Sequence, residues 1–473
     1  MKNISYLLIG FFFSVCQAQS DNINYSNAFK LIDAWLESQK DYESIPGIVA
    51  MVVQDQDLIW SGAFGKSNIE KNINAELSTM CSICSITKTF TAVAIMKLVD
   101  DGKIKLDDNV IDILPSLKID QNHSNKNTIT IRSLLSHGSG LPRDTGHRYW
   151  SAPDFTFPTK KQLNTVLKEL ETENIVGGYL NYSNLGYALL GQIIEQVSGM
   201  SYTKYLKTQV LNPLRMYNSE IDIHKKQYEN QYALGYTAIN RNRTRERVNS
   251  YQTKTMSPAA GLSTSISDLA KYASWQFRLR DASSQEVLYP ASLKKMHEVQ
   301  SKSKDSSRTW GLGFEVYTDA SGITWATHGG ICPGYVSYLK LDLTNKMAYG
   351  IMVNANGVRA YKLLNGITSI LKKMDTTSEN NIENKDFEEY TGYYNLNPWN
   401  SEYYISTWEQ GLVLLYLPSK NPVTSMYFYK KTGKDTFRLV NSNHELTDEI
   451  IFERDKKGKI YRVLNEGNYH LKI

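Results

Sequence analysis

A serine and a lysine lie three residues apart at the start of an apolar segment, in the run Ser85-Ile86-Thr87-Lys88. On a helix, positions i and i+3 share a face, so the Ser85 hydroxyl and the Lys88 amine can point into one pocket. A serine hydroxyl is a weak nucleophile until a base accepts its proton, and a lysine that is shielded from water is neutral and can be that base. The spacing therefore predicts a nucleophile with its proton acceptor, although S-x-x-K alone also occurs by chance.

A tyrosine and an asparagine lie two residues apart in Tyr182-Ser183-Asn184, directly before a second apolar segment. Residues two apart in an extended chain project to the same side. A phenol has a usual pKa of about 10 and acts as a base only where a nearby cation favours the phenolate, and Lys88 is the candidate cation. The Asn184 amide can hold either the lysine or a substrate amide. The alternative is an exposed turn without catalytic duty.

A histidine and two glycines, His328-Gly329-Gly330, close a predicted strand. The glycines allow a ligand to lie close to the strand, as an extended substrate that pairs with a sheet edge requires. The sequence has eight histidines. We predict a structural role for the other seven, including His137 in the run LLSHGSGLP.

Two predicted strands early in the chain and several late ones enclose a mostly helical middle. The apolar spacing predicts helices at 27–40, from Ser85 to Gly102, at 185–198 and at 357–373, with an early hairpin from Pro46 to Gly65. The late strands are predicted at 310–317, 322–329, 334–341 and 346–353. This order indicates an α+β fold in which both ends of the domain build one antiparallel sheet flanked by helices.

The composition changes near the C-terminus. Residues 376–385 are polar and lack periodicity, so we interpret them as a linker. From 386 to 473, short aromatic-rich runs alternate with turns, which predicts a small antiparallel β-barrel.

The order and separation of the three motifs resemble the serine β-lactamase and penicillin-binding protein superfamily, in its class C and D-alanyl-D-alanine carboxypeptidase branch. The runs ITIRSLLSHGSGLP, YSNLGYALLGQIIEQVSG, SPAAGLSTSISDLAKYA and WGLGF agree with it. The resemblance covers residues 27–375, and the tail is similar to the lipocalin-like barrels appended to many members.

The resemblance implies a role for each motif residue. Ser85 is expected to be the acylated nucleophile, with Lys88 as its proton partner. Tyr182 is expected to act as a general base and then as an acid toward the leaving group, while Asn184 positions Lys88 or the substrate. The backbone N–H groups of Ser85 and Ile331 are expected to form the oxyanion hole. No metal and no cofactor are expected.

The third motif departs from members that destroy β-lactams, which usually carry Lys-Thr-Gly at His328-Gly329-Gly330. A neutral histidine holds a substrate carboxylate less firmly than lysine. The motif therefore favours the H-x-G relatives, which resemble peptidases acting on D-residues and esterases. A β-lactamase or D-alanyl-D-alanine carboxypeptidase is the alternative, and a non-catalytic penicillin- or peptide-binding module is the alternative of another class.

Three cysteines lie beside the motifs: Cys81, Cys84 and Cys332. Cys81-x-x-Cys84 has metal-ligand spacing, but no second pair or histidine pair accompanies it, so we expect a packing role. Since Cys84 adjoins Ser85 and Cys332 follows the third motif closely, a disulfide between these two is a further hypothesis.

Charge and targeting signals narrow the partners. The net charge of +5 over 473 residues gives no indication of nucleic-acid binding. The family resemblance implies a small-molecule or peptide substrate, and no oligomeric state is predicted. Lys2 and the apolar run from Ile4 to Val15 predict a signal peptide over residues 1–18 and export to a periplasm or beyond. A lipid anchor at Cys16 is the alternative, and we expect no membrane-spanning helix after removal of the signal.

Overall fold

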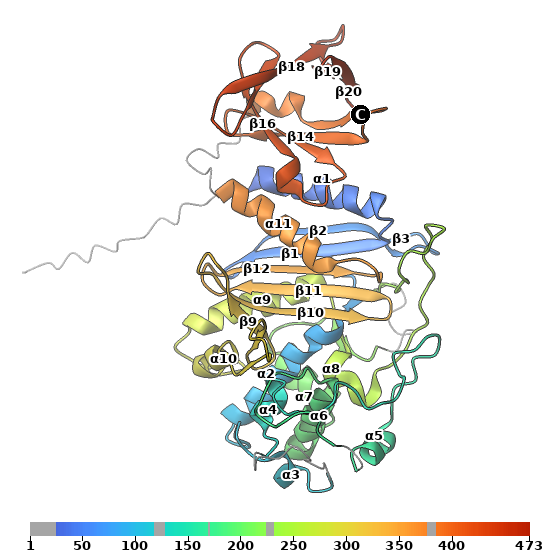
Figure 1. The fold of residues 1–473 in the computed structure, drawn as a ribbon, viewed down its shortest axis with the longest axis vertical. Helices are drawn as coiled ribbons and strands as arrows, with labels where there is room; N and C mark the ends of the chain where they lie inside the picture. Colours follow the sequence, from blue (N-terminus) through green and yellow to red (C-terminus); the bar gives the residue numbers. More distant parts are fainter. Residues whose placement is uncertain (1–24, 118–127, 169–170, 224–230, 376–384) are drawn as a thin grey trace, which may run out of the picture.

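A nine-stranded antiparallel sheet lies at the centre of the structure, a computed structural model that describes residues 25–117, 128–168, 171–223, 231–375 and 385–473 (Figure 1). Its strand order is β3-β2-β1-β12-β11-β10-β9-β8-β7. The strands are β1 (Gly47–Gln54), β2 (Asp57–Asn68), β3 (Ile73–Asn74), β7 (Ser301–Lys302), β8 (Thr309–Trp310), β9 (Glu315–Thr318), β10 (Thr324–Cys332), β11 (Tyr335–Asp342) and β12 (Met347–Val353). Because β1 pairs with β12, the early hairpin and the late strands form one sheet, and the predicted α+β fold class is confirmed.

Both faces of this sheet are covered by helices. Alternate residues of β1 enter two different cores, Val49 and Met51 on one face and Ile48 and Ala50 on the other, as the period-two geometry of a strand requires. Helices α1 (Ser26–Tyr42) and α11 (Ala360–Asp375) cover one face, and α9 (Ile266–Asp281) covers the other (Figure 1). The segment that carries Ser85 lies on the α9 side.

The helical middle of the chain forms a second layer below the sheet in Figure 1. It contains a 3-10 turn η1 (Cys84–Ile86), α2 (Thr87–Asp100), α3 (Val110–Ile113), α4 (Ile131–Leu135), α5 (Lys160–Val166), α6 (Asn184–Ser198), α7 (Tyr202–Leu206), a π-helical turn η2 (Lys207–Leu211), η4 (Lys254–Met256), α8 (Ser257–Ala260) and α10 (Pro290–Met296). A small sheet of β4 (Cys81–Ser82), β5 (Ser219–Ile221) and β6 (Leu262–Thr264) lies beside η1. Since α2 is buried nearly all round, it holds Lys88 on a rigid element, and Ser85 lies in η1 directly before it.

One predicted strand is interrupted. The run 310–317 was expected to be continuous, but the structure divides it between β8 and β9. Gly313 between them has φ +91°, which side chains other than glycine seldom adopt, and Gly311 lies close to the Met296 carbonyl. The aromatic and apolar pattern is that of a strand, but these two glycines bend the chain.

The C-terminal residues form a nearly closed barrel of eight antiparallel strands, which confirms the predicted barrel. Its elements are η6 (Lys385–Tyr390), β13 (Gly392–Asn395), β14 (Glu402–Trp408), β15 (Gly411–Leu417), η7 (Pro422–Ser425), β16 (Met426–Lys431), β17 (Thr436–Val440), β18 (Leu446–Arg454), β19 (Ile460–Asn465) and β20 (Asn468–Leu471). A bridge between Tyr394 and Lys472 brings the two ends of the sheet together. Inside, aromatic side chains such as Tyr403 and Phe437 fill the barrel.

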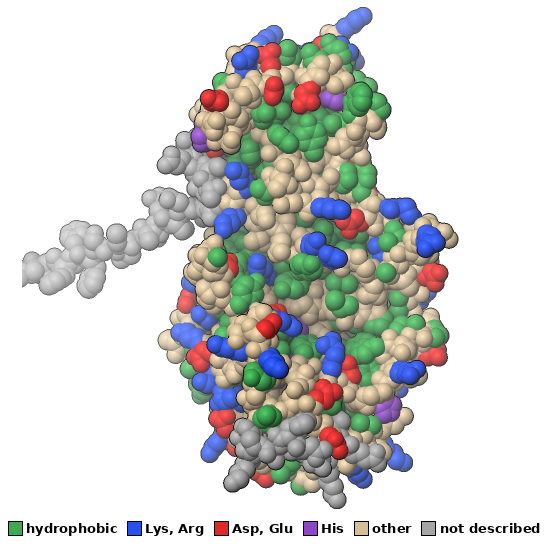
Figure 2. Space-filling model, viewed as in Figure 1, with side chains coloured by type: hydrophobic (Ala, Val, Ile, Leu, Met, Phe, Trp, Pro, Cys, Tyr) green, Lys and Arg blue, Asp and Glu red, His purple; other side chains and the backbone are tan. Residues whose placement is uncertain are grey.

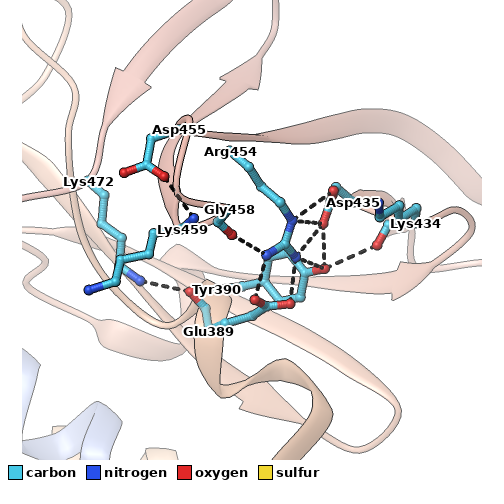
Figure 3. A network of polar contacts seen from close by, with 9 residues as sticks. All are labelled: Glu389, Tyr390, Lys434, Asp435, Arg454, Asp455, Gly458, Lys459 and Lys472. Atoms are coloured by element: carbon cyan, nitrogen blue, oxygen red, sulfur yellow. Dashed lines mark hydrogen bonds and ion pairs between the residues drawn. The ribbon is translucent and has the colours of Figure 1, made fainter.

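A polar network fixes η6 to the barrel (Figure 3). The Arg454 guanidinium donates to Glu389 in η6 at 2.6 Å and to Asp435 at 2.7 Å. The Tyr390 hydroxyl donates to the same Asp435 carboxylate at 2.8 Å. These contacts anchor the chain at the point where it enters the barrel.

Several sequence predictions fall outside the residues that the structure describes. They are the signal peptide at 1–18, the lipid-anchor site Cys16 and residues 376–384 of the linker. Among the described residues, no helix is long and apolar enough to cross a membrane. Figure 2 shows basic and acidic side chains interspersed over the visible face, in keeping with the small net charge.

Candidate active site

The S-x-x-K motif bridges the junction between η1 and α2. Ser85 lies in the 3-10 turn and Lys88 in the first turn of α2, so the two side chains point the same way. The Lys88 Nζ atom lies 3.3 Å from the Ser85 Oγ atom. The Lys88 side chain is fully buried, whereas Ser85 is partly open to solvent. The structure thus joins a reachable hydroxyl to an amine shielded from water.

Two carbonyl oxygens accept hydrogen bonds from the buried Lys88 amine. Nζ donates to the Asn184 Oδ1 atom and to the Ala259 carbonyl oxygen, each at 2.8 Å. Burial, followed by the positive charge of Arg143, lowers the pKa of Lys88 well below its usual value. A neutral amine has two N–H groups and one lone pair. With both N–H groups given to these carbonyls, the lone pair is left to face the Ser85 hydroxyl.

Asn184 is oriented by a carboxylate. Its Nδ2 group donates to the Asp144 Oδ1 atom at 2.8 Å, and the Tyr149 hydroxyl donates to the same oxygen. Because the Asn184 amide nitrogen donates to Asp144, the amide oxygen is turned toward Lys88. Asp144 and Tyr149 were not foreseen, since nothing in their local sequence distinguishes them from other loop residues.

The Tyr182 phenol completes the group around Ser85. It shares a hydrogen bond with the Ser85 hydroxyl, and its ring centre lies 5.0 Å from the Lys88 Nζ atom. Burial raises the pKa of Tyr182 to about 12, and the hydrogen bond from Ser85 only partly opposes this. The pKa therefore moves away from the phenolate that a general base requires. Tyr182 is suited to donate a proton, and Lys88 to accept one.

His137 supports the Tyr182 segment. The backbone N–H of Asn181 donates to the His137 carbonyl at 2.7 Å, and that of Ser183 donates to its Nδ1 atom at 3.1 Å. The His137 and Tyr182 rings lie 4.2 Å apart between their centres. His137 thus has the expected structural role, and it supports Tyr182, the residue that faces Ser85.

The third motif lies within the last part of β10, and the strand continues two residues beyond it. His328 is buried, and its Nδ1 atom lies 2.8 Å from the Gly329 carbonyl oxygen. Burial lowers the pKa of His328 to about 3, so the ring is neutral at physiological pH. Since a carbonyl only accepts hydrogen bonds, Nδ1 carries the proton and Nε2 is an acceptor.

These residues line one cavity of about 380 Å³. Ser85, Tyr182, His328, Gly330 and Ile331 all contribute to its wall, so the structure brings the three motifs together. Lys88 and Asn184 lie behind this wall. Three arginines that the motifs did not indicate also line the cavity: Arg143, Arg308 and Arg359.

The cysteine hypothesis is confirmed. Cys84 and Cys332 form a disulfide with their Cα atoms 5.6 Å apart, and Cys81 is a free, buried thiol. Burial raises the pKa of Cys81 to about 12, which keeps it protonated and unreactive. Within the described part of the chain, no group of three or more His, Cys, Asp or Glu side chains is arranged to hold a metal ion.

The chain matches the Beta-lactamase family over residues 32–366. It belongs to this family. The chain is 30% identical over 339 residues to "Protein flp" of Staphylococcus aureus strain COL. The alignment covers 69% of this chain and 62% of the relative. The chain thus spans less than two thirds of that relative's length.

Solved structures share the fold of this beta-lactamase family member. The octameric penicillin-binding protein homologue from Pyrococcus abyssi has a TM-score of 0.64 and 23% identity, over 93% of this chain and 99% of that one. A D-stereospecific amidohydrolase from Streptomyces sp. has a TM-score of 0.57 and 23% identity, over 72% and 97% of the two chains. At such identities the likeness establishes the fold.

Proposed function

We propose that this protein is a serine hydrolase that cleaves an amide or ester bond through an acyl-enzyme on Ser85. The observation that carries the proposal is the buried Lys88 amine, which has two carbonyl acceptors and faces the Ser85 hydroxyl at 3.3 Å. An amine held neutral by burial accepts the serine proton as the oxygen attacks a carbonyl carbon. Family membership and the shared fold support the same chemistry.

The remaining groups of the site act in the formation and in the hydrolysis of the acyl-enzyme. Tyr182 keeps its proton at neutral pH and lies against Ser85, so it is placed to protonate the leaving amine or alcohol. The backbone N–H groups of Ser85 and Ile331, both on the cavity wall, are assigned to the oxyanion hole. One well-placed donor of this kind contributes about 3–4 kcal/mol to transition-state stabilisation. The proton that Lys88 took from Ser85 then passes to the Tyr182 oxygen, and water attacks the acyl-enzyme with the neutral Lys88 amine as the proton acceptor.

The substrate class follows from the third motif. The neutral His328 side chain lies in the cavity wall where a lysine would present a positive charge, and its Nε2 atom is buried. The absence of a lysine charge at this point favours a substrate that does not depend on it: a small peptide, a D-amino-acid derivative or an ester. The D-stereospecific amidohydrolase among the structural neighbours supports this choice. A β-lactamase or D-alanyl-D-alanine carboxypeptidase is the second candidate, because Arg143 and Arg359 at the cavity provide positive charge for a carboxylate.

Two probes test the proposal on the purified full-length protein. A fluorophosphonate labels an activated serine, and a fluorescent penicillin labels an enzyme that accepts β-lactams; mass spectrometry locates each adduct. We expect the fluorophosphonate to label Ser85 and the Ser85→Ala variant to lose labelling and ester turnover with a melting temperature within a few degrees of wild type. Labelling by both probes supports the second candidate. Absence of both labels overturns the proposal and favours a non-catalytic binding module.

A further inference from the structure

The disulfide lies directly beside both backbone donors that we assign to the oxyanion hole. Cys84 precedes Ser85 in η1, and Cys332 follows Ile331 at the end of β10. Each half of the disulfide is therefore joined through a peptide bond to one of the two donor residues. The two cysteines are 248 positions apart in the sequence, so the bond connects segments that otherwise meet only through folding.

The backbone of Cys84 has an unusual conformation. Its φ of +50° lies in the left-handed region, which residues with a side chain adopt rarely. The peptide group that follows Cys84 carries the Ser85 N–H, so the torsions of Cys84 set the direction of that donor. The covalent bond to Cys332 ties the Cys84 side chain in place and opposes relaxation to an ordinary conformation.

Other contacts join the same segments on the far side of Cys84. The Ser337 hydroxyl donates to the Ile83 carbonyl at 2.9 Å, and Gly330 approaches this carbonyl so closely that a Cβ atom would lie 2.1 Å from it. The disulfide itself is buried, with Tyr335 packed against it. The hydroxyl of Ser82 lies 3.4 Å from the Cys332 sulfur. The two segments therefore meet in a tight, buried contact, and within it the disulfide involves the residue that directly precedes the nucleophile.

We propose that Cys84 and Cys332 are positioning residues, whose disulfide holds the Ser85 and Ile331 N–H groups at the spacing that one oxyanion needs. This inference rests on the proposed acyl-transfer function. Donors stabilise a transition state only when both lie within hydrogen-bond distance of the oxygen on which charge develops. A displacement of about 1 Å in such a site costs about a hundredfold in rate.

The test separates the covalent bond from the backbone strain. In the double variant Cys84→Gly/Cys332→Ala, glycine adopts the left-handed φ freely but the bond is absent. We expect kcat for p-nitrophenyl acetate and the rate of fluorophosphonate labelling of Ser85 to fall about 10- to 100-fold, with KM changed less than about threefold, because the lost interaction belongs to the transition state. The matched control is Cys81→Ala, which alters a nearby buried thiol outside the disulfide and is expected to keep wild-type rates.

A boronic acid, which becomes tetrahedral when it binds the serine, gives a second measurement. Its affinity would not change if the disulfide had only a general structural role. m-Aminophenylboronic acid adds to the serine oxygen and places a boron-bound oxygen in the oxyanion hole. Its affinity should fall by the same factor as kcat/KM. A double variant with wild-type kcat, or a loss confined to KM with unchanged boronate affinity, overturns the inference.

Reduction of the wild-type protein decides the matter if the double variant does not fold. Dithiothreitol supplies two electrons and two protons, which convert the disulfide to the Cys84 and Cys332 thiols while the reagent closes to its cyclic disulfide. Alkylation and mass spectrometry count the new thiols. We expect the reduced, folded protein to lose activity by the same factor and to recover it on reoxidation; unchanged activity overturns the inference. Wild-type protein that fails to label at Ser85 would instead refute the proposed function.

Discussion

Lys88 illustrates how a single residue changes its chemistry through its surroundings. Its side chain is fully buried, and the positive charge of Arg143 adds to the effect of burial on its pKa. Asp144 opposes the shift but is already occupied by hydrogen bonds from Asn184 and Tyr149. The balance leaves a neutral amine next to a serine, whereas an exposed lysine at the same spacing would be protonated and useless as a base.

This balance predicts the pH dependence of the reaction. Because the neutral form of Lys88 is the active one, kcat/KM should rise as pH increases through its lowered pKa and then stay level. Tyr182, with a pKa of about 12, keeps its proton over this range and adds no alkaline decline below about pH 11. The measurement is kcat/KM for p-nitrophenyl acetate from about pH 5 to about pH 10, with the Ser85→Ala rate subtracted. A rate that still rises tenfold per pH unit near pH 10 would show that Lys88 has its ordinary pKa.

At the scale of elements, the site depends on how closely β10 approaches η1. Gly330 is the point of contact, since an added Cβ atom would lie 2.1 Å from the Ile83 carbonyl and 2.4 Å from the Ser337 hydroxyl. At Gly329 the same atom would meet ring carbons of Tyr338 at 3.2 Å. A backbone carbonyl cannot move without its segment, whereas an aromatic ring on the cavity wall can shift by a few tenths of an ångström.

We therefore expect Gly330→Ala to move β10 away from the nucleophile and to reduce kcat/KM about 100-fold. Gly329→Ala is the matched comparison and should cause a loss at least tenfold smaller. Circular dichroism establishes that both variants are folded, and the rate of fluorophosphonate labelling measures the effect on Ser85. Equal rates for the two variants would show that the approach of β10 to Ile83 has no bearing on catalysis.

The three segments that carry the site residues could be predicted from the sequence. The spacing of Ser85 and Lys88, of Tyr182 and Asn184, and the glycines of β10 marked three segments that the structure joins in one cavity. The contacts that tune them come from two loops and the four-residue helix α8: Asp144, the His137 ring and the Ala259 carbonyl. Such contacts depend on tertiary packing between distant segments, and no local spacing encodes them. The disulfide between Cys84 and Cys332 could be predicted because each cysteine lies next to a motif.

At the scale of the whole molecule, the barrel shares one hydrophobic core with the central sheet and its covering helices. Helix α1 lies between the central sheet and the barrel (Figure 1), and barrel residues including Trp408, Val413 and Leu415 pack in the same core as α1, α11 and β1. The Trp35 indole and the Gln39 amide both donate to the Ser419 carbonyl of the barrel, at 2.7 and 2.8 Å. A core of this kind couples the unfolding of the two parts.

We therefore predict that the full chain unfolds in a single calorimetric transition. Trp35→Ala should lower the midpoint temperature of that transition without dividing it into two. The indole is buried, packs against Gly366 and bonds to Ser419, so its loss should cost about 3–5 kcal/mol, a shift of several degrees for a chain of this size. Trp399→Ala is the control, because that barrel tryptophan is 75% exposed and its loss should change stability by less than about 0.5 kcal/mol. Two separate transitions in the wild-type protein, with only one moved by Trp35→Ala, would show that the barrel unfolds independently of the central sheet and its helices.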